Sequence, residues 1–323
     1  MDNDTSHKIT RIAIACQGGG SHTAFTAGVL KRILKEENKE FEIIALSGTS
    51  GGAICALLTW YGLLTNDKKK SIRLLDAFWQ ENSTRSYWEK ILNEWMLWSA
   101  RMPELMAIPA MSPYSYPPWA QDYLKTLLEK HVKFDTLGTL IKPSSPKLYI
   151  GGVNVRTGGF KVFKSDVKNH EISAQAILAS AAIPTLFRAV HVDNKIYWDG
   201  LFSQNPPLKD FVKGRSRTKP DEIWIIQINP DRREEEPKSI KAIEERRSEL
   251  AGNLSLNQEI DFIHTVNKWV DQKYLPADKY KHVHIEEIVM ERDLDLASKF
   301  DRSEDFIKDM MAYGEEKAGR LFE

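Results

Sequence analysis

Cysteine is scarce in this chain of 323 residues, which contains only Cys16 and Cys55. Two cysteines cannot form the disulfide framework of a small secreted domain, and their spacing matches no zinc-binding pattern. Both lie in apolar stretches, so we expect buried free thiols in a reducing compartment.

Long apolar runs and an excess of charge of either sign are also missing. The longest apolar runs, such as 53–58, are far shorter than the roughly 20 residues of a membrane-spanning helix. Residues 1–8 are polar and lack the apolar core of a signal peptide. The chain has 45 basic and 45 acidic side chains, so no overall attraction to nucleic acid or anionic lipid is expected. We predict a cytoplasmic protein without a nucleic-acid partner, whose membrane contact would be peripheral and through a local patch.

The N-terminal part of the chain contains two consecutive strand–turn–helix patterns. An apolar strand at 12–16 precedes a glycine turn and a helix at 24–34, and a second strand at 43–46 precedes another glycine turn and a helix at 53–63. Two such units predict an α/β fold with a mainly parallel sheet.

Further elements follow from periodicity and turn residues. The segment 72–128 is rich in tryptophan and interrupted by prolines, so it predicts an irregular helical region. We expect a hairpin at 148–163, a short helix at 173–180, alternating strands at 190–198, a buried strand at 223–228, a last strand at 282–288 and a closing helix at 303–321. A helix at 239–268 has an apparent apolar side formed by Ile240, Ile243, Leu250, Leu254, Ile260, Ile263 and Val266.

The second glycine turn, Gly48-Thr49-Ser50-Gly51-Gly52, fits the pattern G-x-S-x-G between a strand and a helix. A serine on that sharp turn is exposed at the carboxyl edge of the sheet, and the glycines allow the close approach of strand and helix. Ser50 is therefore the candidate nucleophile, supported by Gly48, Gly51 and Gly52. The alternative is a helix-capping serine in an ordinary glycine-rich turn. None of the eight histidines has the context of a conventional triad base.

The first glycine turn, Gly18-Gly19-Gly20, could direct backbone N–H groups toward one point, as an oxyanion hole requires. The competing interpretation is a phosphate cradle for a nucleotide. It lacks support because the glycines do not extend to G-x-G-x-x-G and no Walker lysine follows.

In combination these motifs resemble the patatin-like phospholipases. The chain has the glycine turn, G-x-S-x-G about thirty residues later, the small-residue segment 179–184, and Asp199-Gly200-Leu201 followed by Asn205-Pro206-Pro207. The resemblance covers about 12–207. It implies a three-layer α/β/α fold with a helical cap insertion, and a Ser-Asp dyad in which Asp199 is the general base beside Gly200.

Two positions depart from the family pattern. His22 and Thr23 occupy the positions where the family often has a basic residue and then a glycine, and Leu201 replaces a small residue. We expect His22 to support the oxyanion loop in a pH-dependent way, or this position to carry no such role.

The resemblance implies one domain over 1–323, with a core at about 10–230, a cap at about 70–135 and a C-terminal helical extension at about 239–323. It also implies a hydrolase of fatty acyl esters of lipids, without cofactor or metal. A carboxylesterase or acyltransferase acting on soluble esters or thioesters is the alternative, and an inactive binding module is another. The tryptophan-rich segment forms either an apolar cap with an acyl groove or a helical subdomain with buried tryptophans, and Trp95 and Trp98 are candidate surface anchors. The oligomeric state is open.

Overall fold

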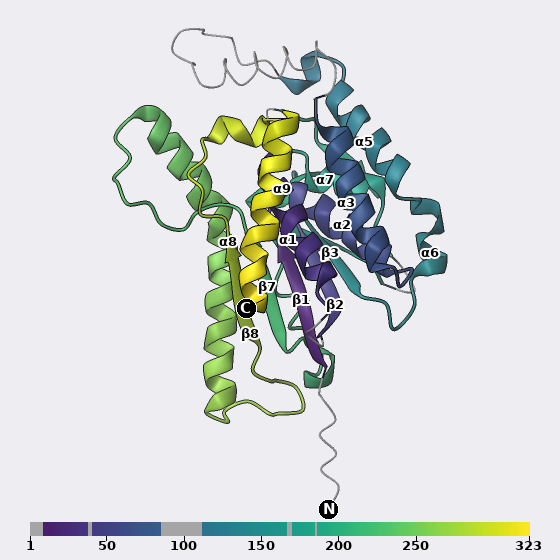
Figure 1. Cartoon of the computed structure of the whole chain (residues 1–323), viewed down its shortest axis with the longest axis vertical. Coiled ribbons are helices and arrows are strands. Elements are labelled where there is room, and N and C mark those ends of the chain that lie inside the picture. The colour runs from purple at the N-terminus through teal and green to yellow at the C-terminus, as the bar shows by residue number, and fades with distance from the viewer. Residues whose placement is uncertain (1–8, 38–40, 85–111, 167–169, 185) are drawn as a thin grey trace, which may run out of the picture.

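The computed structural model describes residues 9–37, 41–84, 112–166, 170–184 and 186–323 (Figure 1). Within these ranges, no helix combines the length and the apolar character that crossing a membrane demands. The predicted anchors Trp95 and Trp98 lie outside the described residues.

A mixed sheet forms the centre of the fold. Its strand order is β5-β6-β3-β2-β1-β7-β8, and β4 also pairs with β3. The pairs β1–β2, β1–β7, β2–β3 and β7–β8 are parallel, whereas β4 and β6 run antiparallel to β3. The strands are β1 (Thr10–Cys16), β2 (Phe41–Gly48), β3 (Lys147–Asn154), β4 (Phe160–Lys164), β5 (Val190–Val192), β6 (Lys195–Asp199), β7 (Glu222–Gln227) and β8 (His284–Val289).

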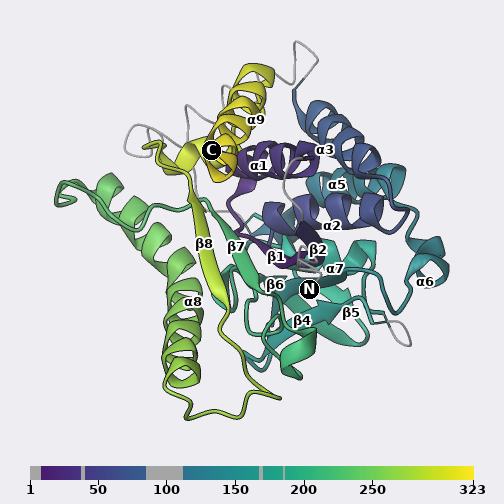
Figure 2. The ribbon, with the colours of Figure 1, turned by 60° about the horizontal axis from the view of Figure 1, so that its bottom comes forward.

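Helices cover both faces of this sheet (Figure 2). One face carries α1 (Ala24–Lys35), α2 (Gly51–Leu63), α3 (Lys68–Asn82), α5 (Trp119–His131), α6 (Leu137–Leu140), α7 (Ala174–Ser180) and α9 (Glu304–Gly319). The long helix α8 (Ile240–Asp271) covers the other. The predicted α/β fold with a mainly parallel sheet between helical layers is confirmed.

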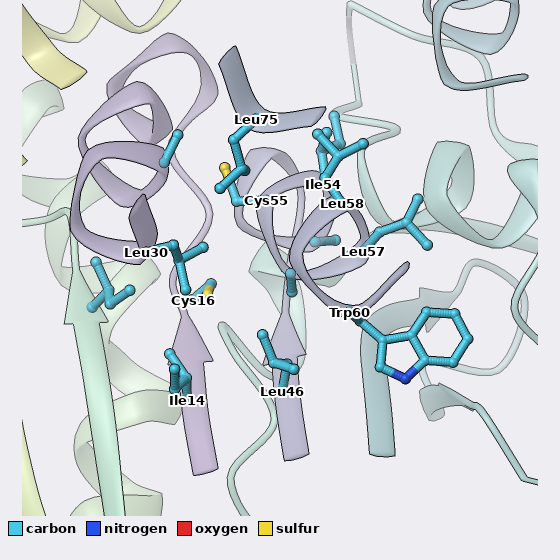
Figure 3. Close-up of a cluster of buried hydrophobic side chains, with 14 of the residues drawn as sticks. Ile14, Cys16, Leu30, Leu46, Ile54, Cys55, Leu57, Leu58, Trp60 and Leu75 are labelled. Atoms are coloured by element: carbon cyan, nitrogen blue, oxygen red, sulfur yellow. The ribbon is translucent and has the colours of Figure 1, made fainter. Parts of the chain in front are cut away.

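Alternation along the central strands divides the core into two parts. Ile12, Ile14 and Cys16 of β1 point into the larger cluster, which α1 and α2 complete (Figure 3), while Ala13 and Ala15 point into the cluster under α8. Cys16 and Cys55 are buried free thiols, as predicted. Burial raises the pKa of Cys55 to about 12, so this thiol stays protonated near neutral pH.

The prediction for the apolar side of α8 is wrong in its first half. Ile240, Ile243, Leu250 and Leu254 are all exposed. The helix instead packs on the sheet through Leu256 and Ile263, which belong to the core under α8. Its buried side also contains polar residues, among them Asn253 and Asn267, which periodicity of apolar residues could not assign to the interior.

The described parts of the predicted cap pack closely against the body. Helix α3 lies against α1 and α2, and α5 lies against α3 and α7. Trp79 is buried, as the alternative of core tryptophans implied, whereas Trp119 is 71% exposed. The division into a core, a cap and a C-terminal extension stays a prediction.

Candidate active site

Ser50 occupies a strained turn between β2 and α2. Its backbone has φ 56° and ψ −129°, a conformation that a non-glycine residue adopts only at a cost of about 1–3 kcal/mol. The turn is so tight that a Cβ on Gly48 would lie 2.5 Å from the carbonyl oxygen of Gly52. Ser50 caps α2 by position, yet its side chain accepts no capping hydrogen bond. The hydroxyl is therefore free for another partner.

Strand β3 brings Asp199 beside this turn. Ile150 of β3 pairs with Gly48 at the end of β2, and Gly152 pairs with Asp199 at the end of β6. Because β4 occupies the opposite edge of β3 at both positions, β2 and β6 share one edge. The partners of Gly48 and Asp199 on β3 are two residues apart, a distance of about 7 Å along a strand. The carboxyl ends of β2 and β6 therefore lie side by side.

Glycines at this junction permit the close approach. A Cβ on Gly151 would lie 2.8 Å from Thr49 Oγ1, and one on Gly200 would lie 2.7 Å from the Gly151 carbonyl oxygen. Thr49 Oγ1 donates a hydrogen bond of 2.7 Å to the carbonyl of Gln204. The serine turn and the loop after Asp199 are thus held against each other by direct contacts.

The Asp199 carboxyl is 1% exposed and only partly hydrogen-bonded. Oδ1 accepts a bond of 2.8 Å from the Leu201 N–H, while Oδ2 is buried without a hydrogen-bond partner. Burial raises the pKa of Asp199 to about 7, and the Leu201 N–H and the Ser50 hydroxyl each offset part of that rise. A carboxylate with this pKa can accept a proton near neutral pH.

The first glycine turn lies directly beside Ser50. A Cβ on Gly18 would be 2.9 Å from the Ser50 Cβ, so only glycine fits there. The Gly18 N–H donates to Asn205 Oδ1 at 2.8 Å, which occupies one of the predicted oxyanion donors. The N–H groups of Gly19 and Gly20 donate to no acceptor among the described residues. Gly20 has φ +57°, and a Cβ there would lie 2.3 Å from the Lys299 carbonyl oxygen.

The small-residue segment contacts the serine turn as well. Ser180, the last residue of α7, accepts a hydrogen bond of 3.1 Å from the Ser50 N–H. The N–H of Asp199 donates to the carbonyl of Ala182 at 3.0 Å. The motifs singled out in the sequence therefore converge on one edge of the sheet.

His22 does not supply a pH-dependent charge, which corrects that expectation. The ring is buried, and its Nε2 lies 2.7 Å from Ser298 Oγ. Burial, aided by the positive charge of Lys299, lowers the pKa of His22 to about 3. The ring is neutral over the physiological range, so it supports the loop only by packing and by this hydrogen bond.

Sequence reasoning missed Gln17 and its partners. Gln17 Oε1 accepts from the N–H groups of Ile228 at 2.7 Å and Asn229 at 2.9 Å, and its Nε2 donates to Asn253 Oδ1 at 2.8 Å. The glycine turn is thereby tied to the end of β7 and to α8. The available signal in the sequence was a polar residue placed between the apolar run 12–16 and the three glycines.

Potential metal ligands do not gather anywhere in the described ranges, where no group of three or more His, Cys, Asp or Glu side chains could hold a metal ion. Nor does this part of the chain contain a glycine loop with a lysine suited to a nucleotide phosphate.

The fold and this turn define an α/β protein with a mainly parallel sheet and a serine on a strained strand–helix turn. A family model described as patatin-like phospholipase matches residues 14–212. The chain belongs to the patatin-like phospholipase family. Helix α8, β8 and α9 lie beyond the matched residues.

Comparison with individual proteins adds one structural likeness. No curated protein matches the chain in sequence. Among solved structures, VipD from Legionella pneumophila aligns at 14% identity and a TM-score of 0.46, covering 97% of this chain and 67% of VipD.

Proposed function

We propose that this protein is a lipid acyl hydrolase of phospholipase A or lysophospholipase type, acting through Ser50 and Asp199. Family membership supports hydrolysis of lipid esters as the general class. The main support for the dyad is that β2 and β6 pair with the same edge of β3. This pairing places the serine turn beside Asp199, whose pKa is about 7. We further propose that the protein is cytoplasmic and contacts membranes peripherally.

The proposed reaction is a two-step acyl transfer. Ser50 Oγ attacks the ester carbonyl carbon while its proton passes to the Asp199 carboxylate, and the carbonyl oxygen becomes an oxyanion. The free N–H groups of Gly19 and Gly20 stabilise this oxyanion, and the Gly18 N–H joins them if it releases Asn205. Asp199 returns the proton to the departing alcohol. In the second step Asp199 takes a proton from water while the water oxygen attacks the acyl carbon. The bond from that carbon to Ser50 Oγ then breaks, Asp199 returns the proton to Ser50 Oγ, and the fatty acid leaves.

The surroundings of Asp199 support its proposed role as base. An aspartate with an ordinary pKa near 3.9 is a poor base for a serine hydroxyl. Burial brings the pKa of Asp199 close to the working pH, where general-base catalysis is most effective. The buried Oδ2, which lacks a partner, offers a place for the Ser50 proton.

Hydrolysis of a lipid mixture, with products identified by mass spectrometry, tests this function. Wild type should release fatty acids, whereas Ser50→Ala and Asp199→Asn should not. Release that survives both substitutions contradicts the assignment of the dyad. Turnover of short nitrophenyl esters without turnover of micellar phospholipid would favour the carboxylesterase alternative. A folded wild type that a fluorophosphonate fails to label would favour an inactive module.

A further inference from the structure

Lys299 lies on a short 3₁₀ helix, Leu296–Phe300, that packs against the first glycine turn. A Cβ on Gly20 would lie 2.3 Å from the carbonyl oxygen of Lys299 and 3.3 Å from its Cβ. Ser298, the residue before it, is hydrogen-bonded to the His22 ring. This 3₁₀ helix lies beyond the segment that the family model matches, so the family match assigns it no part in the site.

The side chain of Lys299 carries a charge that no carboxylate of the described residues pairs. Its Nζ donates to Asn229 Oδ1 at 2.8 Å and forms no salt bridge within these ranges. The negative charge of Glu249 acts on it, but Arg233 and Arg246 already bond the oxygens of this carboxylate. Burial lowers the pKa of Lys299 to about 8, so the amine is charged at pH 7. A partly buried ammonium without a paired carboxylate costs stability, so stability alone does not explain a lysine here.

The amine of Lys299 reaches the glycine turn through Asn229. The Asn229 N–H donates to Gln17 Oε1 at 2.9 Å, and Gln17 directly precedes the glycine turn. The backbone contact with Gly20 and the side-chain bond to Asn229 therefore hold the turn at both of its ends. The N–H groups of Gly19 and Gly20, the proposed oxyanion donors, depend on the orientation that these contacts fix.

From these contacts we propose that Lys299 is a positioning residue of the candidate active site, which keeps the glycine turn oriented toward the oxyanion. The proposal rests on the proposed function, because it concerns the donors of that reaction. It adds Lys299 to the support that His22 gives the same turn. The oxyanion forms only during the reaction, so a displaced turn should lower kcat and leave KM nearly unchanged.

Removal of the amine tests this role. Lys299→Met keeps the length of the side chain, and kcat for nitrophenyl butyrate should fall about tenfold. This loss is smaller than the roughly 10²–10³-fold cost of deleting an oxyanion donor, because both N–H groups are still present. KM should change by less than about twofold. The melting temperature should change little, since the lost bond to Asn229 is offset by the removal of an unpaired charge.

Lys299→Arg keeps a charged donor and should recover most of the lost kcat. A cavity of about 20 Å³ adjoins Lys299 and leaves room for the guanidinium. A kcat in Lys299→Arg as low as in Lys299→Met would overturn the proposal.

Lys219 provides the matched control. Its Nζ also donates to an uncharged acceptor, the carbonyl of Lys279 at 2.7 Å, and burial lowers its pKa as well. Lys219 precedes β7, whereas Asn229 follows it, so the two lie at opposite ends of this strand. Lys219→Met should leave kcat unchanged. Equal falls of kcat and of melting temperature in Lys219→Met and Lys299→Met would reduce the role of Lys299 to fold stability.

Asn229→Ala tests the same link from its other side, and does so even if Lys299→Met fails to fold. It removes Oδ1 and keeps the backbone bond to Gln17. Its kcat should fall about as far as that of Lys299→Met, and the double variant should fall no further, because both changes remove one bond. Losses that multiply in the double variant, or an unchanged kcat in Asn229→Ala, would overturn the proposal.

Fluorophosphonate labelling of Ser50 separates this proposal from the proposed function. The phosphoryl oxygen of the probe takes the place of the oxyanion, so labelling should slow in Lys299→Met in parallel with kcat. If wild type neither hydrolyses nitrophenyl butyrate nor becomes labelled, the proposed function fails. If wild type does both and Lys299→Met equals it in both, the positioning role of Lys299 fails alone.

Discussion

Asn253 of α8 offers a sharp test of how the candidate site is supported. The residue is 2% exposed and accepts a hydrogen bond of 2.8 Å from Gln17 Nε2. Its own Nδ2 donates to the carbonyl of Asn229 at 3.2 Å and to Asp231 Oδ1 at 2.8 Å. In Asn253→Ala, Gln17 Nε2 keeps only a long contact of 3.4 Å to the Gly252 carbonyl.

The expected magnitude follows from these bonds. A buried polar group left unsatisfied costs about 1–3 kcal/mol. Alanine is the better helix former and returns about 0.5 kcal/mol. We therefore expect Asn253→Ala to lower the free energy of unfolding by about 1–2 kcal/mol.

Asn257, one turn along the same helix, is the matched control. It is exposed, and its Nδ2 reaches Asp231 Oδ1 at 3.2 Å. Asn257→Ala should change the free energy of unfolding by no more than about 0.5 kcal/mol. Urea unfolding followed by circular dichroism measures both variants. Fluorophosphonate labelling of Ser50 should slow in Asn253→Ala alone, because Gln17 orients the glycine turn. Equal stability losses, or equal labelling rates with unequal stabilities, would refute this reasoning.

Further predictions concern the dyad itself. Because the pKa of Asp199 is about 7, kcat/KM on a soluble ester should rise about tenfold per pH unit up to about pH 7 and level off above it. A kcat/KM that does not change between about pH 5 and 9 would exclude Asp199 as the base. The pKa of this carboxyl is raised from 3.8 on folding, so its protonation favours the folded state, and this contribution is lost as pH rises from about 4 through about 7. Asp199→Asn should therefore be more stable than wild type at pH 8, by on the order of 4 kcal/mol at most, and no more stable than wild type below pH 4. Thermal unfolding at both pH values measures this difference in stability. A difference that does not vary with pH would contradict the prediction. Ser50→Gly should relieve the strain of a φ of 56° and stabilise the fold by about 1 kcal/mol, whereas Ser50→Ala should not. Neither variant should react with a fluorophosphonate. Equal melting temperatures of the two variants would show that the turn stores no strain.

Local patterns were enough to predict the elements that carry the site. The strand–turn–helix units depend on apolar periodicity and glycine positions within about twenty residues, and these placed Ser50 between β2 and α2. The sheet class followed because two consecutive units of this kind require parallel neighbours. The order of the motifs also predicted the family, which the match over residues 14–212 bears out.

Only the tertiary structure determined how these elements meet. Asp199 reaches the serine turn because β6 and β2 share one edge of β3, a pairing between segments far apart in sequence. The pKa of Asp199 depends on burial by the whole fold, and the bond from Gly18 to Asn205 depends on a loop placed nearly two hundred residues later. The side of α8 that faces the sheet was decided by hydrogen bonds of Asn253 as well as by apolar packing. The periodicity of apolar residues predicts which side of a helix or strand is apolar. It does not predict the hydrogen-bond partner of a buried polar group, because that partner is determined only when distant parts of the chain pack together.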